Sequence, residues 1–235
     1  MDYFWTRRSD FPPECVESPG EITRPRRHLN VVCTQLSMPA AAQRKLVQSW
    51  CDVLPTLEKV EYLWFHSRVP QRLFDAACQV PRLKGLYIKW SGIKRLEAIG
   101  HASQLEAFHL GDSAQVESIE CLGAMTKLRW LDLVNIKRVS RLDPLGKLRR
   151  LEGLGVEGSV WTTQRVETLA PIGQLANLRY LSIVNLRSAD RTLKPLFALR
   201  RLEAFHAAAW WAPEEVAELR RRNRRLRPTS WTDHR

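Results

Sequence analysis

The chain has 235 residues, of which 44% are hydrophobic, and 37 lysines and arginines against 25 aspartates and glutamates give it a formal net charge of +12. No stretch approaches the roughly 18 unbroken apolar residues of a membrane span, and the N-terminus lacks the basic and apolar pattern of a secretory signal. The excess positive charge favours acidic partners, whether a protein, a nucleic acid or an anionic surface.

The cysteines are odd in number and widely spaced. They are Cys15, Cys33, Cys51, Cys78 and Cys121, and no two have CxxC spacing. This pattern argues against a disulfide framework and against a zinc site. We expect them to be small buried hydrophobic side chains in a reducing, cytoplasmic compartment, with no metal and no cofactor.

The N-terminal part divides into two segments. Residues 1–27 hold aromatic residues, two adjacent prolines and balanced charges, and they fit either an irregular arm packed on the next segment or a segment that orders only on a partner. Residues 28–57 are expected to form an N-terminal cap, with a strand at Leu29–Cys33. A helix should follow, with Ser37 as its capping residue, and run to about Leu54.

Residues 58–208 contain seven copies of the pattern LxxLxL, or close variants of it. The copies begin at residues 60, 83, 105, 128, 151, 178 and 202. Ahead of most of them an apolar residue recurs at every third position, as in Leu142, Leu145 and Leu148, which is the period of a tight helical or 3₁₀ turn. Each unit is therefore a strand, a loop and a helical return, and only stacking of the units buries their apolar faces.

These strands, with returns of the form L-x-P-L-G-x-L, resemble the short 22–24-residue leucine-rich repeats of internalin-type bacterial proteins. The resemblance implies an α/β solenoid, a curved right-handed arc with a concave parallel sheet, short helical or 3₁₀ convex returns and helical caps. The family usually carries an asparagine after each strand. The matching positions here are Ser91, Ser113, Ile136, Ser159 and Leu186, which puts the turn geometry in question where Asn135 and Asn185 stand one residue earlier.

One repeat and the C-terminus depart from the pattern. The copy that begins at residue 151 has four extra residues near Val160–Gln164, and Trp161 there fits either a partner contact or a side chain folded onto the convex face. Residues 209–235 should form a capping helix and a short strand at Leu226–Trp231. The helix carries possible anion-binding residues, unless Glu218 neutralises part of a solvated face by pairing with Arg222. These residues are Arg220, Arg221, Arg222, Arg224 and Arg225.

The side chains between the repeat leucines should face outward from the concave sheet, because side chains alternate along a strand. Large side chains gather there in the first four repeats, and tyrosine and tryptophan are enriched at interface hot spots. The residues expected to contact a partner are Tyr62, Trp64, His66, Tyr87, Lys89, His109, Trp130, Asp132 and Tyr180. Cover by a loop or by the N-terminal arm is the alternative. Glycines and alanines in later repeats predict a shallower sheet there.

Catalysis would need a nucleophile, a base and an orienting group within hydrogen-bond reach. His109 and Asp132 are expected neighbours, as are Ser182 and His206, but Gly155 separates Asp132 from Ser182 by roughly 10 Å. We therefore expect no enzyme but a scaffold that binds an acidic protein on its concave face, as an adaptor, an effector's recognition module or an inhibitor. The alternative is an electrostatic binder of nucleic acid or an anionic surface through the C-terminal arginines.

Overall fold

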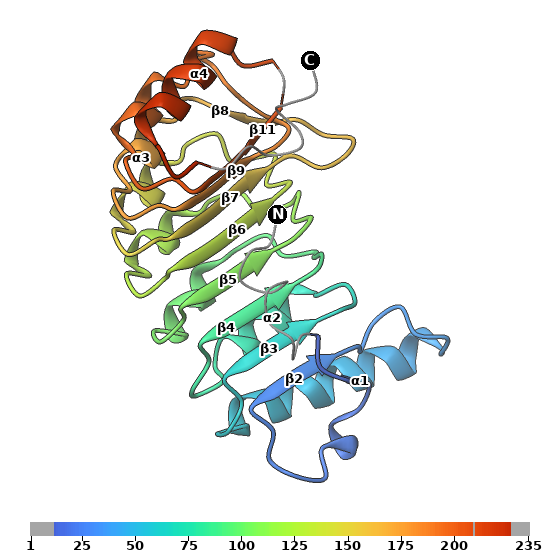
Figure 1. The fold of residues 1–235 in the computed structure, drawn as a ribbon. Coiled ribbons are helices and arrows are strands. Elements are labelled where there is room, and N and C mark those ends of the chain that lie inside the picture. Colours follow the sequence, from blue (N-terminus) through green and yellow to red (C-terminus); the bar gives the residue numbers. More distant parts are fainter. Residues whose placement is uncertain (1–11, 209, 227–235) are drawn as a thin grey trace.

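The computed structural model describes residues 12–208 and 210–226 of the chain. Within them, one parallel sheet lines the concave side of a curved stack, and short helices cover the opposite side (Figure 1). The strands are β1 (Cys15–Val16), β2 (His28–Val31), β3 (Tyr62–Phe65), β4 (Gly85–Ile88), β5 (Ala107–Leu110), β6 (Trp130–Val134), β7 (Gly153–Glu157), β9 (Tyr180–Ile183) and β11 (Ala204–Ala207). They lie in chain order, so the α/β solenoid predicted from the repeats is confirmed.

The returns on the convex side are short because their apolar residues recur every third position. The 3₁₀ helices are η1 (Pro19–Glu21), η2 (Leu54–Thr56), η3 (Glu97–His101), η4 (Glu120–Ala124), η5 (Asp143–Lys147) and η6 (Lys194–Ala198). The α-helices are α1 (Ala40–Val53), α2 (Gln71–Ala77), α3 (Ala170–Gly173) and α4 (Pro213–Arg222). A second, two-stranded parallel sheet joins β8 (Gln164–Val166) to β10 (Leu186–Ser188).

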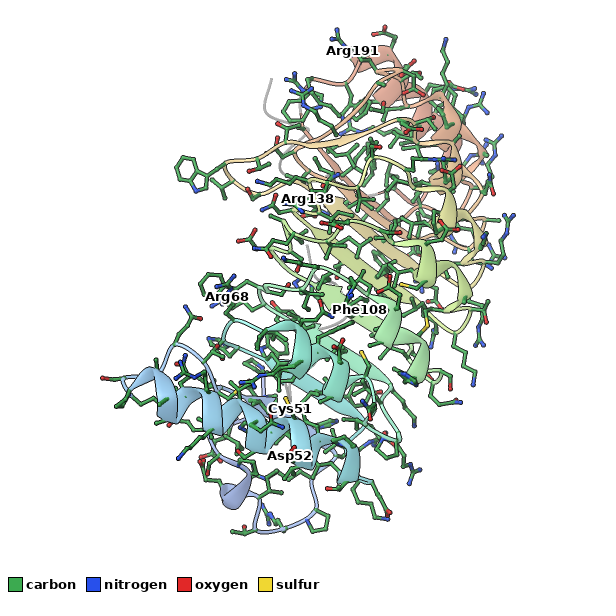
Figure 2. The ribbon with its side chains drawn as sticks, turned by 180° about the vertical axis from the view of Figure 1, so that it is seen from behind. Cys51, Asp52, Arg68, Phe108, Arg138 and Arg191 are labelled. Carbon is green, nitrogen blue, oxygen red and sulfur yellow. The ribbon has the colours of Figure 1, made fainter. Side chains whose placement is uncertain are left out.

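The core lies between the concave sheet and the returns. Leu131 and Leu133 of β6 are 1% and 0% exposed, and the return residues Leu145 and Leu148 are fully buried. Seen from behind in Figure 2, Phe108 of β5 lies among the side chains of this layer. Truncating one such leucine to alanine typically costs about 2–5 kcal/mol, so the repeat pattern is the main source of stability.

The N-terminal segments follow one of the two expected alternatives and differ from the prediction at Ser37. Residues 12–27 pack on the cap: β1 pairs with β2, and the Trp50 indole donates a hydrogen bond to the Glu17 carbonyl at 2.8 Å. The expected capping role of Ser37 is wrong, because α1 begins after Pro39 and no side chain caps it. The Gln43 side chain instead accepts the Leu36 amide at 3.2 Å. Residues 1–11, and the strand expected at the C-terminus, lie outside the described residues apart from Leu226.

The turns after β6 and β9 replace the usual asparagine position in a regular way. Asn135 and Asn185 have φ values of 53° and 52°, a left-handed conformation that asparagine tolerates better than most residues. The next residues, Ile136 and Leu186, are thereby turned inward and are fully buried. In these two repeats the asparagine stands one residue earlier than usual, and an apolar side chain at the usual asparagine position fills the core.

Serines take over the buried polar position in the two earlier repeats. The Ser113 hydroxyl donates to the Gly111 carbonyl at 2.9 Å, and the hydroxyls of Ser91 and Ser113 lie 2.7 Å apart. Ser91 also accepts the Ile93 amide at 3.2 Å. These contacts confirm that serine partly replaces the asparagine ladder of the repeat.

The five cysteines are all free. Cys33 and Cys78 are buried as expected, Cys51 and Cys121 are partly buried, and Cys15 is exposed, contrary to expectation. Burial raises the pKa of Cys33 to about 12 and that of Cys121 to about 11. Thiols with such raised pKa values carry little thiolate and are poor nucleophiles.

A ladder of alternating charge runs along the N-terminal edge of the strands. Its members are Arg27, Glu61, Lys84, Glu106, Arg129, Glu152, Arg179 and Glu203, one for each strand of the concave sheet from β2 to β11. Glu61 pairs with Arg27 at 2.6 Å and with Lys84 at 3.1 Å, and Glu152 pairs with Arg129 at 2.6 Å. Although burial opposes the shift, hydrogen bonds from Arg27 and Lys84 lower the pKa of Glu61. This edge ladder was not predicted from the sequence.

Replacing Glu152→Lys should destabilise the fold, because it sets three positive side chains on adjacent strands. We expect the free energy of unfolding, measured by urea denaturation, to fall by about 1–2 kcal/mol at low salt. The deficit should shrink in 1 M salt, where exposed charges are screened. Glu58→Lys is the matched control, because Glu58 is exposed and has no side-chain partner among the described residues. Equal losses in both variants at both salt concentrations would contradict a stabilising ladder.

Candidate protein-binding surface

Strand register creates two full columns of outward side chains on the concave sheet. The first column is Tyr62, Gly85, Ala107, Trp130, Gly153, Tyr180 and Ala204. The second column is Trp64, Tyr87, His109, Asp132, Gly155, Ser182 and His206. Both columns match those expected from the repeat pattern.

Three rings in the second column stack on one another. The rings of Trp64 and Tyr87 lie 3.5 Å apart at an angle of 12°, and those of Tyr87 and His109 lie 4.2 Å apart at 6°. Parallel strands about 4.8 Å apart hold successive rings at near stacking distance. The row ends at Asp132, whose Oδ2 is 3.6 Å from His109 Nδ1. Trp64 and Tyr87 are half-buried, whereas the side chains of His109 and Asp132 are mostly buried, at 12% and 14% exposed.

The first column adds two more rings to the same surface. Tyr62 forms one apolar cluster with Ala107, Trp64, Tyr87 and Trp130. We call Tyr62, Trp64, Tyr87, His109 and Trp130 the concave aromatic patch. It spans β3 to β6, and His66 and Lys89 lie exposed just beyond the ends of β3 and β4.

The glycines of β7 make room for side chains of β6. A Cβ added at Gly153 would lie 2.2 Å from the Trp130 ring, and one at Gly155 would lie 2.4 Å from Asp132 Oδ1. Trp130 therefore lies over Gly153 and stacks with Tyr180, with ring centroids 5.3 Å apart. The expectation of a shallower sheet does not hold at these two glycines, because the side chains of Trp130 and Asp132 fill the space above them.

Tyr180 differs from the other predicted contact residues. Like Tyr62, which is 9% exposed, it is buried, at 7% exposed, but its hydroxyl donates to Glu203 Oε2 at 3.2 Å. The Arg179 guanidinium lies 5.3 Å from its ring centroid. Tyr180 is thus fixed by the edge ladder and supports Trp130 from the side.

The C-terminal arginines are partly neutralised. Glu218 pairs with Arg221 at 2.7 Å and with Arg222, which confirms the expected pairing of Glu218 with Arg222. These hydrogen bonds lower the pKa of Glu218 to about 2. Arg220, Arg224 and Arg225 are exposed. Arg225 lines an open pocket with Arg200, Arg201, Arg179 and Glu203, at the C-terminal end of the edge ladder.

The candidate catalytic groups have other partners. The Ser182 hydroxyl donates to Glu157 Oε1, so its proton is directed at a carboxylate. His206 is buried beside Ser182, and this burial lowers its pKa. In the described part of the chain, no three or more histidine, cysteine, aspartate or glutamate side chains gather into a metal site. The same residues contain no helix long and apolar enough to span a membrane.

No protein-family model and no curated protein sequence matches this chain. Solved structures do. An internalin of Listeria monocytogenes aligns with a TM-score of 0.54 and 17% identity over 73% of this chain. A leucine-rich-repeat protein of Leptospira interrogans aligns with a TM-score of 0.62 and 18% identity over 91% of this chain. A plant peptide hormone receptor in complex with RGF2 aligns with a TM-score of 0.52 and 14% identity over 69% of this chain.

These likenesses establish the fold: the chain is a leucine-rich-repeat solenoid of the internalin-like type. The chain spans 54% of the length of the internalin, 51% of the Leptospira protein and 26% of the plant receptor. Solenoids of this fold present an extended concave surface.

Gly153→Ala should displace the Trp130 ring, because the added methyl group would overlap it. We expect a loss of about 1–3 kcal/mol in unfolding free energy and a change in tryptophan fluorescence. Gly100→Ala is the control, since a Cβ there meets nothing within 4 Å. If Gly153→Ala matched this control in stability and spectrum, the proposed packing of Trp130 over Gly153 would be wrong.

Proposed function

We propose that this protein is a non-catalytic scaffold that binds another protein on its concave face. The observation that carries the proposal is the concave aromatic patch, in which the rings of Trp64, Tyr87 and His109 stack in one continuous row. Tyrosine and tryptophan supply large contact areas and lose few rotamers on binding. Rings already held by their neighbours lose still less, so the patch is pre-organised for a partner.

The charge of the molecule favours an acidic partner. The net charge of +12 speeds encounter with a negatively charged protein. His66 and Lys89 lie exposed at one side of the concave aromatic patch, where carboxylates of a partner would pair with them. The plant receptor, which was solved in complex with RGF2, supports the use of this fold for protein or peptide recognition. Adaptor, effector module and enzyme inhibitor are all roles that such a surface serves.

The double variant Trp64→Ala with Tyr87→Ala should keep the fold and lose the partner. The partner would be captured from the native host lysate with and without nuclease, identified by mass spectrometry, purified and titrated. We expect affinity to fall by about 100-fold or more, because two central aromatic anchors are removed. Phe197→Ala is the matched control, because Phe197 is a half-buried ring on the convex return η6.

Two outcomes would contradict this proposal. Unchanged affinity in the well-folded double variant would exclude the concave aromatic patch as the binding site. Captured material that disappears with nuclease, and whose binding falls steeply with salt, would favour the nucleic-acid alternative. In that case Arg200, Arg201 and Arg225, which share one pocket, are the residues to reverse in charge.

A further inference from the structure

The insertion in the repeat that begins at residue 151 carries the most exposed aromatic side chain of the described residues. Trp161 is 93% exposed and Val160 is 87% exposed. The alternative in which Trp161 folds onto the convex face is therefore wrong. Exposing an indole and a valine together forgoes burial that would be worth roughly 25 cal/mol per Å².

Exposed apolar side chains are concentrated at one place. Among the described residues, the large hydrophobic side chains with high exposure are Val160, Trp161, Val184 and Trp210. They follow the C-terminal ends of β7, β9 and β11, which are neighbours in the sheet. Hydrogen bonds link their segments: the Gly158 amide donates to the Val184 carbonyl at 3.1 Å, and the Trp210 indole to the Leu186 carbonyl at 3.1 Å. We call these four residues the apolar rim.

The loop that presents Trp161 is held in place by hydrogen bonds to the next repeat. The Asn185 side chain donates to the carbonyls of Ser159 and Thr162, at 2.6 Å and 3.1 Å, and accepts from the Thr163 hydroxyl at 3.0 Å. A Cβ at Gly158 would lie 2.2 Å from the Thr162 carbonyl oxygen, so the loop closes tightly on itself. Such a loop presents its tryptophan with little conformational freedom left to lose on binding.

Two arginines beside the loop face solvent. Arg165 of β8 and Arg187 of β10 are register partners on adjacent parallel strands, and both are exposed. No carboxylate of the described residues pairs with either, and the Arg187 guanidinium lies 4.6 Å from the Trp210 ring centroid. Like charges on adjacent strands repel one another. Carboxylates supplied by a partner would relieve this repulsion.

We propose that the apolar rim is a second docking surface for an acidic protein. Trp161 enters an apolar pocket of that protein, and carboxylates around the pocket pair with Arg165 and Arg187. The rim lies on β7 to β11 and the concave aromatic patch on β3 to β6, so the two surfaces are separate. Binding at a membrane interface scales with the apolar area that is inserted, and the rim offers only a small area, since Val184 and Trp210 are no more than 39% and 42% exposed. A single indole fits a pocket of a protein better.

The test begins with a photo-reactive amino acid at position 161, cross-linked in the host cells, and identification of the attached protein. That protein is then purified and titrated against variants of the full chain. Trp161→Ala should weaken binding about 30-fold or more, and Trp161→Phe by about fivefold at most. Arg165→Glu with Arg187→Glu should weaken it about tenfold, with a smaller dependence on salt. Arg200→Glu is the control, an exposed arginine on the opposite edge.

The exposure of Trp161 makes the result easy to interpret, because Trp161→Ala should leave the melting temperature unchanged. The proposal is overturned if no acidic protein cross-links or if Trp161→Ala binds as tightly as the unaltered chain. Trp161-dependent binding to phosphatidylglycerol vesicles would assign the rim to a membrane instead. Trp161-dependent self-association in sedimentation would assign it to a second copy. The double variant of Trp64 and Tyr87 separates this surface from the concave one, since it should still cross-link at position 161.

Discussion

One strand per repeat, stacked in parallel and in register, is the constraint on which every other feature of this molecule depends. It places equivalent residues of successive repeats about 4.8 Å apart, so the side chains at one repeat position contact those at the same position of the neighbouring repeats. On the inner side this gives the leucine core. On the concave side it gives the stacked rings of Trp64, Tyr87 and His109, and along the edge it gives alternating charges.

Register also explains why small residues stand beside large ones. A large side chain of one strand can extend over the neighbouring strand, and a glycine at that position leaves room for it. Gly153 leaves room for the Trp130 ring, and Gly155 leaves room for the Asp132 carboxylate. Ala107, fully buried, lies within the cluster formed by Tyr62, Trp64, Tyr87 and Trp130. The aromatic surface and the glycines are therefore one packed unit.

The strands, the returns and both outward columns follow from periodicity, which the sequence displays directly. The direction in which a side chain tilts along the sheet does not follow from periodicity, and so the packing of Trp130 over Gly153 was not predicted. The edge ladder was visible as alternating signs at one repeat position, from Glu61 to Glu203, once the copies are aligned. Trp161 could not be oriented from sequence because an insertion has no equivalent in the neighbouring repeats to fix its direction. Ser37 is not the cap because α1 begins at Ala40, so that Pro39 and not Ser37 stands at the N-cap position.

The most direct test of the proposed binding site on the concave face is ¹⁹F NMR of the protein labelled with 5-fluorotryptophan, with and without the purified partner. The nine tryptophans would be assigned by single substitutions to phenylalanine. The resonances of Trp64 and Trp130 should shift or broaden when the partner is added, while that of Trp50, buried in the core, should not move. Saturation with the partner that leaves Trp64 and Trp130 unchanged would contradict binding at the concave face.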